Sequence, residues 1–148
     1  MFEKFSERSR RVVVLGQQAA MELRHGYLGT EHLLIGLVDE EVGLAARCLR
    51  EAGWDAASVR EAVLGVVAPG DGPAGTHLPF TPRAKAAIEH ALGFSMRLGQ
   101  TFVGTEHLLL GILYDHACVA ATALSTRGPV DALHGRLHVL IDEANPGF

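Results

Sequence analysis

Apolar residues recur at helical spacing along almost the whole chain, and no alternating stretch is long enough to predict a strand. Side chains that suit helix caps and helix ends divide the first half into four helices. The first runs from the cap Ser6 to about Arg24, and the second starts at the cap Thr30 and carries Leu33, Leu34 and Leu37. The third runs from about Val42 to Ala52 and is ended by Gly53, and the fourth runs from the cap Asp55 to about Val67.

The segment from Ala68 to Pro79 contains three prolines and three glycines, a composition typical of a loop. Thr81 and Pro82 then begin a new helix, with threonine as its cap and proline at the first helical position. Helices five to eight mirror the first four, and the last begins near Pro129 and stops before Asn145.

The chain contains an internal repeat with an offset of 75 residues. The stretch 29–37, Gly-Thr-Glu-His-Leu-Leu-Ile-Gly-Leu, recurs at 104–112 with seven of nine positions identical. The match fades after Gly53 and Gly128. One face of the first helix is apolar or small in both copies, at Val12/Ala87, Gly16/Ala91, Ala19/Phe94 and Leu23/Leu98.

These patterns predict an all-α fold, an eight-helix bundle of two four-helix repeats related by a pseudo-twofold axis. Repeat one covers about 5–67, a linker about 68–79 and repeat two about 80–142. All 148 residues form one domain, because a 75-residue half would be marginally stable alone.

Composition excludes several classes of protein. A net charge of -4 gives no electrostatic footprint for nucleic acid. No apolar run approaches the ~20 residues that span a bilayer, and the start of the chain lacks a signal segment. We therefore expect a cytoplasmic protein without nucleic-acid or membrane partners. Cys48 and Cys118 occupy non-equivalent repeat positions, and we expect both to be reduced and buried.

No catalytic or metal-binding signature occurs in the sequence. His134 and His138 can share a helix face, but no third ligand stands at diagnostic spacing, and HExxH and CxxC are absent. The chain also lacks G-x-S-x-G and the phosphate-binding G-x-x-x-x-G-K-[ST]. We expect no enzyme activity, no catalytic residue, no metal and no cofactor.

The repeated Gly-Thr-Glu-His element has two interpretations. In the structural one, glycine permits a tight turn, threonine caps the helix, glutamate complements the positive helix end and histidine bonds the opposite copy. In the functional one, the helix amides attract an anion while the carboxylate attracts a guanidinium, so a phosphorylated arginine satisfies both. The candidate phosphoarginine-binding residues are Thr30, Glu31, Thr105 and Glu106, and this role requires the glutamates to be open to solvent.

The first helix is more apolar than its inward face requires. Val14 and Leu15 are apolar, whereas their repeat partners Glu89 and His90 are polar. An apolar patch that includes Phe2 and Val14 predicts a recognition surface. Alternatively, the N-terminus folds back over the core.

Three motifs point to a known family: the duplicated GTEHLLxG, the opening Met1–Phe5 and the restart Phe80–Lys85. Together they resemble the Clp N-terminal repeat domain, in particular that of ClpC-type AAA+ unfoldases from actinobacteria. The resemblance covers roughly residues 1 to 142. It implies an eight-helix bundle at the front of an ATP-driven unfoldase that feeds the ClpP protease, where it recognises substrates and adaptor proteins without catalysis.

The resemblance also implies roles for particular residues. In ClpC-type domains, glutamates that match Glu31 and Glu106 hold the guanidinium of phosphoarginine. In actinobacterial members, a face built from the first and fifth helices binds cyclic-peptide antibiotics and adaptors. The residues here that match this face are Phe2, Arg10, Val13, Val14, His77, Phe80, Lys85 and Glu89.

The chain departs from the family pattern after each copy of the motif. The usual Arg-Glu-Gly-Glu-Gly is replaced at 39–43 and again at 114–118, and the family's Leu-Gly-His at the end of the first helix is Leu-Gly-Gln at 98–100. This drift favours an alternative, a stand-alone paralogue that sequesters cyclic-peptide antibiotics or shared substrates.

Overall fold

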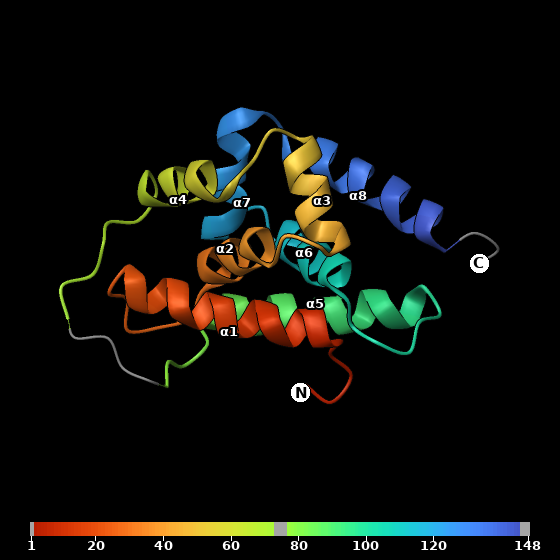
Figure 1. Ribbon diagram of the computed structural model, residues 1–148, viewed down its shortest axis with the longest axis horizontal. Helices are drawn as coiled ribbons and strands as arrows, with labels where there is room; N and C mark the ends of the chain where they lie inside the picture. Colours follow the sequence, from red (N-terminus) through yellow and green to blue (C-terminus); the bar gives the residue numbers. More distant parts are fainter. Residues whose placement is uncertain (1, 73–76, 146–148) are drawn as a thin grey trace.

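The computed structural model describes residues 2–72 and 77–145. These residues form eight α-helices and one short 3-10 helix, and they contain isolated β-bridges but no β-strand. The predicted all-helical fold is therefore confirmed (Figure 1). The helices are α1 (Glu7–Glu22), α2 (Thr30–Glu40), α3 (Leu44–Glu51), α4 (Ala56–Leu64), α5 (Pro82–Arg97), α6 (Thr105–Tyr114), α7 (Val119–Leu124), η1 (Ser125–Arg127) and α8 (Val130–Ala144).

Two of the expected helix boundaries are wrong. Helix α3 begins at Leu44 rather than Val42, because the Glu40 carboxylate accepts hydrogen bonds from the amides of Val42 and Gly43 and holds these residues in a turn. Helix α4 ends at Leu64 rather than Val67. The expected end at Gly53 is confirmed by its φ of 91°, a conformation that favours glycine.

Helices α2 and α6 occupy the centre of the bundle, between the α1/α5 layer and the other helices (Figure 1). Helix α1 packs along α2, and α5 packs in the same way along α6. The approach is close because Gly36 and Gly111 have no side chain. A Cβ at Gly36 would lie 2.3 Å from the carbonyl oxygen of Val12, and one at Gly111 would lie 2.1 Å from that of Ala87.

The segment that precedes the first helix of each repeat pairs with a segment of the other repeat. The segment before α1 pairs with the segment before α6, where the Ser6 amide donates to the Val103 carbonyl at 3.0 Å. The equivalent segment before α5 pairs with the segment before α2, where the Thr81 amide donates to the Leu28 carbonyl at 3.0 Å. Backbone hydrogen bonds therefore join the two repeats in a reciprocal way.

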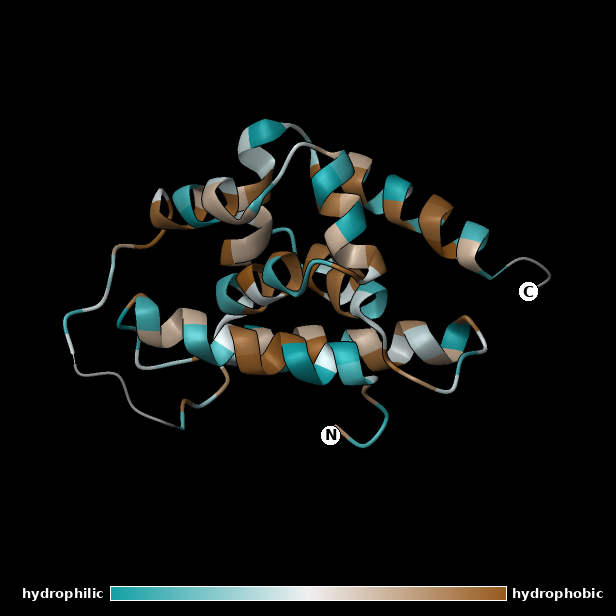
Figure 2. Ribbon diagram, viewed as in Figure 1, coloured by the Kyte–Doolittle hydropathy of each residue, from teal (hydrophilic) through white to brown (hydrophobic). Residues whose placement is uncertain are grey.

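Hydrophobic side chains concentrate between the helices, and a hydrophobic stretch also crosses the middle of α1 (Figure 2). Within it, Val14 is 54% exposed. Cys48 and Cys118 are buried free thiols, as expected. No single helix in the described ranges is long and apolar enough to cross a membrane, although α6 and the segment 119–127 together have the length and composition of a span that is bent by 89°.

Candidate functional site: two cavities at the tips of the central helices

Glu31 and Glu106 are the second residues of α2 and α6. The expectation that both glutamates are open to solvent is wrong, since Glu31 is 2% and Glu106 is 7% exposed. Each carboxylate folds back over the glycine that caps its helix. A Cβ at Gly29 would lie 2.1 Å from a Glu31 oxygen, and one at Gly104 would lie 2.2 Å from a Glu106 oxygen.

Both buried carboxylates nevertheless border a cavity. The Glu106 cavity, of about 910 Å³, lies between the tip of α6, the start of α1 and the turn from α2 to α3. The Glu31 cavity, of about 360 Å³, lies between the tip of α2 and the starts of α5 and α7. Each glutamate therefore faces helices of the other repeat, and neither half of the chain forms a complete cavity.

An arginine from the opposite repeat lines each cavity. Arg8 borders the Glu106 cavity and pairs with Glu40 at 3.3 Å. Its repeat equivalent Arg83 borders the Glu31 cavity and pairs with Asp115 at 2.5 Å. Although burial of Asp115 acts in the opposite direction, the hydrogen bond from Arg83 contributes to lowering the pKa of its carboxyl group.

The threonines of the motif bind the opposite repeat. The expectation that each caps its own helix is wrong, because Gly29 and Gly104 hold the cap positions. Instead, Thr30 Oγ1 accepts a hydrogen bond at 3.3 Å from the Ala120 amide in α7. Thr105 Oγ1 accepts one at 3.3 Å from the Ala45 amide in α3. The threonines thus cap helices across the pseudo-twofold axis.

The histidines of the motif act within their own repeat, so the expected bond to the opposite copy is wrong. His32 Nδ1 accepts from the Gly29 amide at 2.9 Å, and His107 Nδ1 accepts from the Gly104 amide at 2.8 Å. Burial lowers the pKa of each imidazole to about 4. Both rings are therefore neutral at pH 7 and serve as acceptors for the tight turn.

The two copies differ in what surrounds the histidine. In repeat one, His32 Nε2 lies 2.8 Å from His25 Nδ1, and His25 Nε2 lies 2.8 Å from the Ala68 carbonyl oxygen, which joins the motif to the linker. In repeat two, position 100 is glutamine. The Nε2 of His107 and the Oε1 of Gln100 are both buried without a partner in the described part of the chain.

The aromatic residues expected on the α1/α5 face form a cluster. The Phe2 ring lies 5.7 Å from the Phe80 ring and 5.0 Å from the Phe5 ring. Arg10 holds the N-terminal segment by donating to the carbonyl oxygens of Phe5 at 3.3 Å and Phe2 at 3.2 Å. The N-terminus therefore packs against the core, while Val14 stays exposed beside it.

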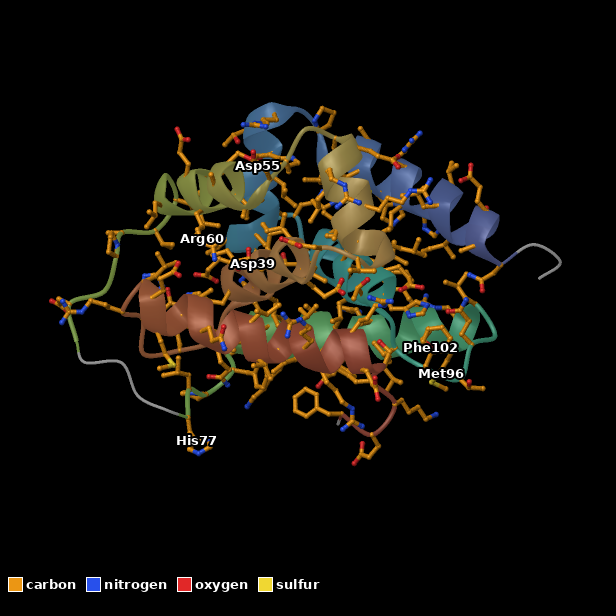
Figure 3. The ribbon with its side chains drawn as sticks, in the orientation of Figure 1. Asp39, Asp55, Arg60, His77, Met96 and Phe102 are labelled. Carbon is orange, nitrogen blue, oxygen red and sulfur yellow. The ribbon has the colours of Figure 1, made fainter. Side chains whose placement is uncertain are left out.

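The remaining candidates on this face share no polar contact with that cluster. Val13 is half-buried against the core, whereas Lys85 and Glu89 are exposed on α5. His77 is exposed and points away from the bundle near the end of the linker (Figure 3).

Several residues that line the two cavities were missed by sequence reasoning. Tyr27 borders the Glu31 cavity and Phe102 the Glu106 cavity, and Arg11 also borders the latter. Tyr27 and Phe102 are separated by the repeat offset, which is the signal that would have paired them. In Figure 3, Phe102 and Met96 lie in the region where α5 ends. No group of three potential metal ligands occurs among the described residues.

Residues 4–126 match the Clp repeat (R) N-terminal domain family, and the chain belongs to this family. It is 40% identical over 128 residues to the chloroplastic chaperone protein ClpC2 of Oryza sativa subsp. japonica and, over the same length, to the chloroplastic ClpC1 of Arabidopsis thaliana. Each alignment covers 86% of this chain and 14% of the relative. The chain therefore spans about one seventh of the length of these relatives.

Solved structures show the same fold. The N-terminal domain of ClpD from Arabidopsis thaliana has a TM-score of 0.77 at 23% identity, covering 96% of this chain and 97% of that one. The Hsp104 N-terminal domain from Candida albicans has a TM-score of 0.77 at 16% identity, covering 94% and 92%. A complex of the ClpV N-domain with a VipB peptide has a TM-score of 0.69 at 20% identity, covering 96% and 86%.

Proposed function

We propose that this chain is a non-catalytic recognition domain that delivers substrates or adaptors to a ClpC-type unfoldase feeding the ClpP protease in the cytoplasm. We further propose that it binds protein segments that carry phosphorylated arginine. The observation that carries this proposal is the pair of cavities that cross the repeat boundary. In each of them, a buried glutamate at a helix tip faces an arginine of the opposite repeat.

These charges suit a phosphorylated guanidinium. The ligand's cationic nitrogens can donate to the glutamate carboxylate, while its phosphate accepts from the arginine guanidinium. Burial of the glutamate strengthens its contact with the ligand, because a charge pair is less screened in a protein interior than in water. An unmodified arginine satisfies only the carboxylate, so the phosphate supplies the specificity.

The chemistry of the thiols agrees with a non-catalytic role. Burial, followed by the nearby charge of Glu51, raises the pKa of Cys48 to about 11. Burial also raises the pKa of Cys118. Because the thiolate is the nucleophilic form of cysteine, neither residue is activated at neutral pH.

Calorimetric titration with phosphoarginine tests the proposal. We expect the wild type to bind and the double variant Glu31→Gln with Glu106→Gln to lose binding. Glu61→Gln is the control, because Glu61 is exposed on α4 and lines neither cavity. Equal affinity of the double variant and the wild type would exclude phosphoarginine as a ligand of these two glutamates.

A second ligand is favoured by the apolar surface of α1. Val14, 54% exposed, lies on the helix whose Arg10 holds the Phe2 and Phe80 cluster in place. We propose that this face, with Val13, His77, Lys85 and Glu89 at its edges, binds cyclic peptides or adaptor proteins. Phe80→Ala should weaken binding of an actinobacterial cyclic peptide by about 2–4 kcal/mol.

The exposed Val14→Asp variant provides an independent check, because it changes the surface without removing a packed ring. Binding unchanged by both substitutions would exclude this face.

A further inference from the structure

We infer that the two cavities are not equivalent: the Glu106 carboxylate is free to bind a phosphorylated guanidinium, whereas the hydroxyl of Tyr27 occupies the Glu31 carboxylate and prevents binding there. This inference rests on the proposed function and names the residue that decides which cavity binds.

In the Glu31 cavity, the carboxylate already has a donor. The Tyr27 hydroxyl donates to Glu31 Oε2 at 3.2 Å. The Tyr27 ring is itself held, since it stacks on the His25 ring with centroids 5.1 Å apart and planes 11° apart. His25 is bonded to the Ala68 carbonyl oxygen. The linker thus fixes the tyrosine, and a ligand must displace its hydroxyl to reach Glu31.

In the Glu106 cavity, the equivalent residue is Phe102, which has no hydroxyl group. No side chain in the described part of the protein donates to the Glu106 carboxylate, whose own backbone N–H is its donor. Burial raises the pKa of this carboxyl group. A buried carboxylate without a counter-ion is costly, so a cationic ligand group relieves that cost.

The arginines of the two cavities also favour binding in the Glu106 cavity. Both Arg8 and Arg11 line the Glu106 cavity, and Arg11 has no ion-pair or hydrogen-bond partner in ranges 2–72 and 77–145. The repeat equivalent of Arg11 is Ala86. Among the described residues, Arg83 is therefore the only arginine that lines the Glu31 cavity, and it is already paired with Asp115. A phosphate therefore meets an uncommitted guanidinium in one cavity and none in the other.

Size agrees with this difference. The Glu106 cavity holds about 910 Å³ and the Glu31 cavity about 360 Å³. Val67, which follows α4, narrows the smaller one. The repeat equivalent of Val67 is Asp142, which lies within the longer helix α8 and does not line the larger cavity.

The test is calorimetric titration of the full chain with phosphoarginine. The wild type should bind one equivalent, Glu106→Gln should abolish binding, and Glu31→Gln should not change it. Tyr27→Phe should add a second but weaker site, because Arg83 stays paired with Asp115. Phe102→Tyr should weaken the first site about tenfold or more, because the new hydroxyl can satisfy Glu106. Tyr114→Phe, which removes the hydroxyl of the other tyrosine, should leave the stoichiometry at one.

Arg11→Ala is a second variant for the open cavity, since Arg11 is exposed and its loss does not disturb the core. It should also weaken binding about tenfold or more. Two wild-type sites of equal affinity would overturn this inference while leaving the proposed function intact. If neither the wild type nor Tyr27→Phe binds phosphoarginine, both this inference and the proposed function are overturned.

Discussion

The Glu31 and Glu106 cavities are built on the same backbone from the same four-residue motif, yet their carboxylates differ in state. Glu31 accepts from Tyr27, whereas Glu106 has no side-chain donor among the described residues. The residues that create this difference, at 27/102 and 11/86, lie outside the motif. A duplicated motif therefore preserves geometry, while its neighbours decide whether each copy is available to a ligand.

Both repeats contain a buried histidine, His32 or His107. Lowering the pH should therefore change the free energy of unfolding more than any single substitution below. Their folded-state pKa of about 4 lies below the ordinary value of 6.5. The unfolded chain therefore binds more protons between pH 6.5 and 4, and the free energy of unfolding falls as pH decreases through that window.

Each histidine contributes up to about 3 kcal/mol to this fall. The raised pKa of Glu106 acts with the opposite sign and reduces the total. Urea unfolding between pH 7 and pH 4 measures the change. A flat profile would show that the two rings take up protons as readily in the folded state as in the unfolded chain.

The glycines at the contact between the first and second helices of each repeat should give the next largest effect. Gly36→Ala and Gly111→Ala both place a Cβ against a backbone carbonyl that cannot move independently. We expect each to lower the free energy of unfolding by about 3 kcal/mol. Gly72→Ala is the control, because nothing lies within 4 Å of its added Cβ. Unequal losses would break the equivalence of the two helix pairs.

The difference between His25 and Gln100 should produce effects of opposite sign. His25→Gln removes the acceptor for His32 and should destabilise the protein by about 1–2 kcal/mol. Gln100→His offers an acceptor to the orphaned His107 Nε2 and should stabilise it by about 1 kcal/mol. Thermal unfolding of both variants measures the pair, and destabilisation by both would mean that repeat two is adapted to glutamine.

The caps across the repeat boundary should give the smallest effect. Thr30→Val and Thr105→Val each leave a helix amide without its acceptor, at Ala120 and Ala45. We expect a loss of about 1 kcal/mol in each case. Chemical denaturation measures both, and a loss in only one variant would contradict the symmetry of the caps.

Much of the fold could be predicted from the sequence, because helical periodicity and the 75-residue offset specify the elements and their pairing. The inward positions Val12, Gly16 and Ala19 are buried as expected. The error at Val42 arises because hydrophobicity does not report the turn that Glu40 holds.

The candidate site was less predictable. The repeat identified Glu31 and Glu106 as equivalent residues at two helix tips. The pattern also predicted that Thr30 caps its own helix and that His32 bonds the opposite repeat, and both predictions were wrong. The role of Thr30 depends on how the repeats cross, which no local spacing records, whereas His32 accepts from the amide only three residues before it. The hydroxyl of Tyr27 is held at Glu31 by the stacking of Tyr27 on His25, which is hydrogen-bonded to the linker only in the folded chain.

Amide chemical shifts during titration of the wild type with phosphoarginine test the inequality of the two cavities most directly, because they resolve each site. We expect the amides of Gly104, Thr105 and Arg11 to shift, while those of Gly29 and Thr30 stay in place. Equal shifts at the two helix tips, or shifts at Gly29 and Thr30 alone, would contradict the account.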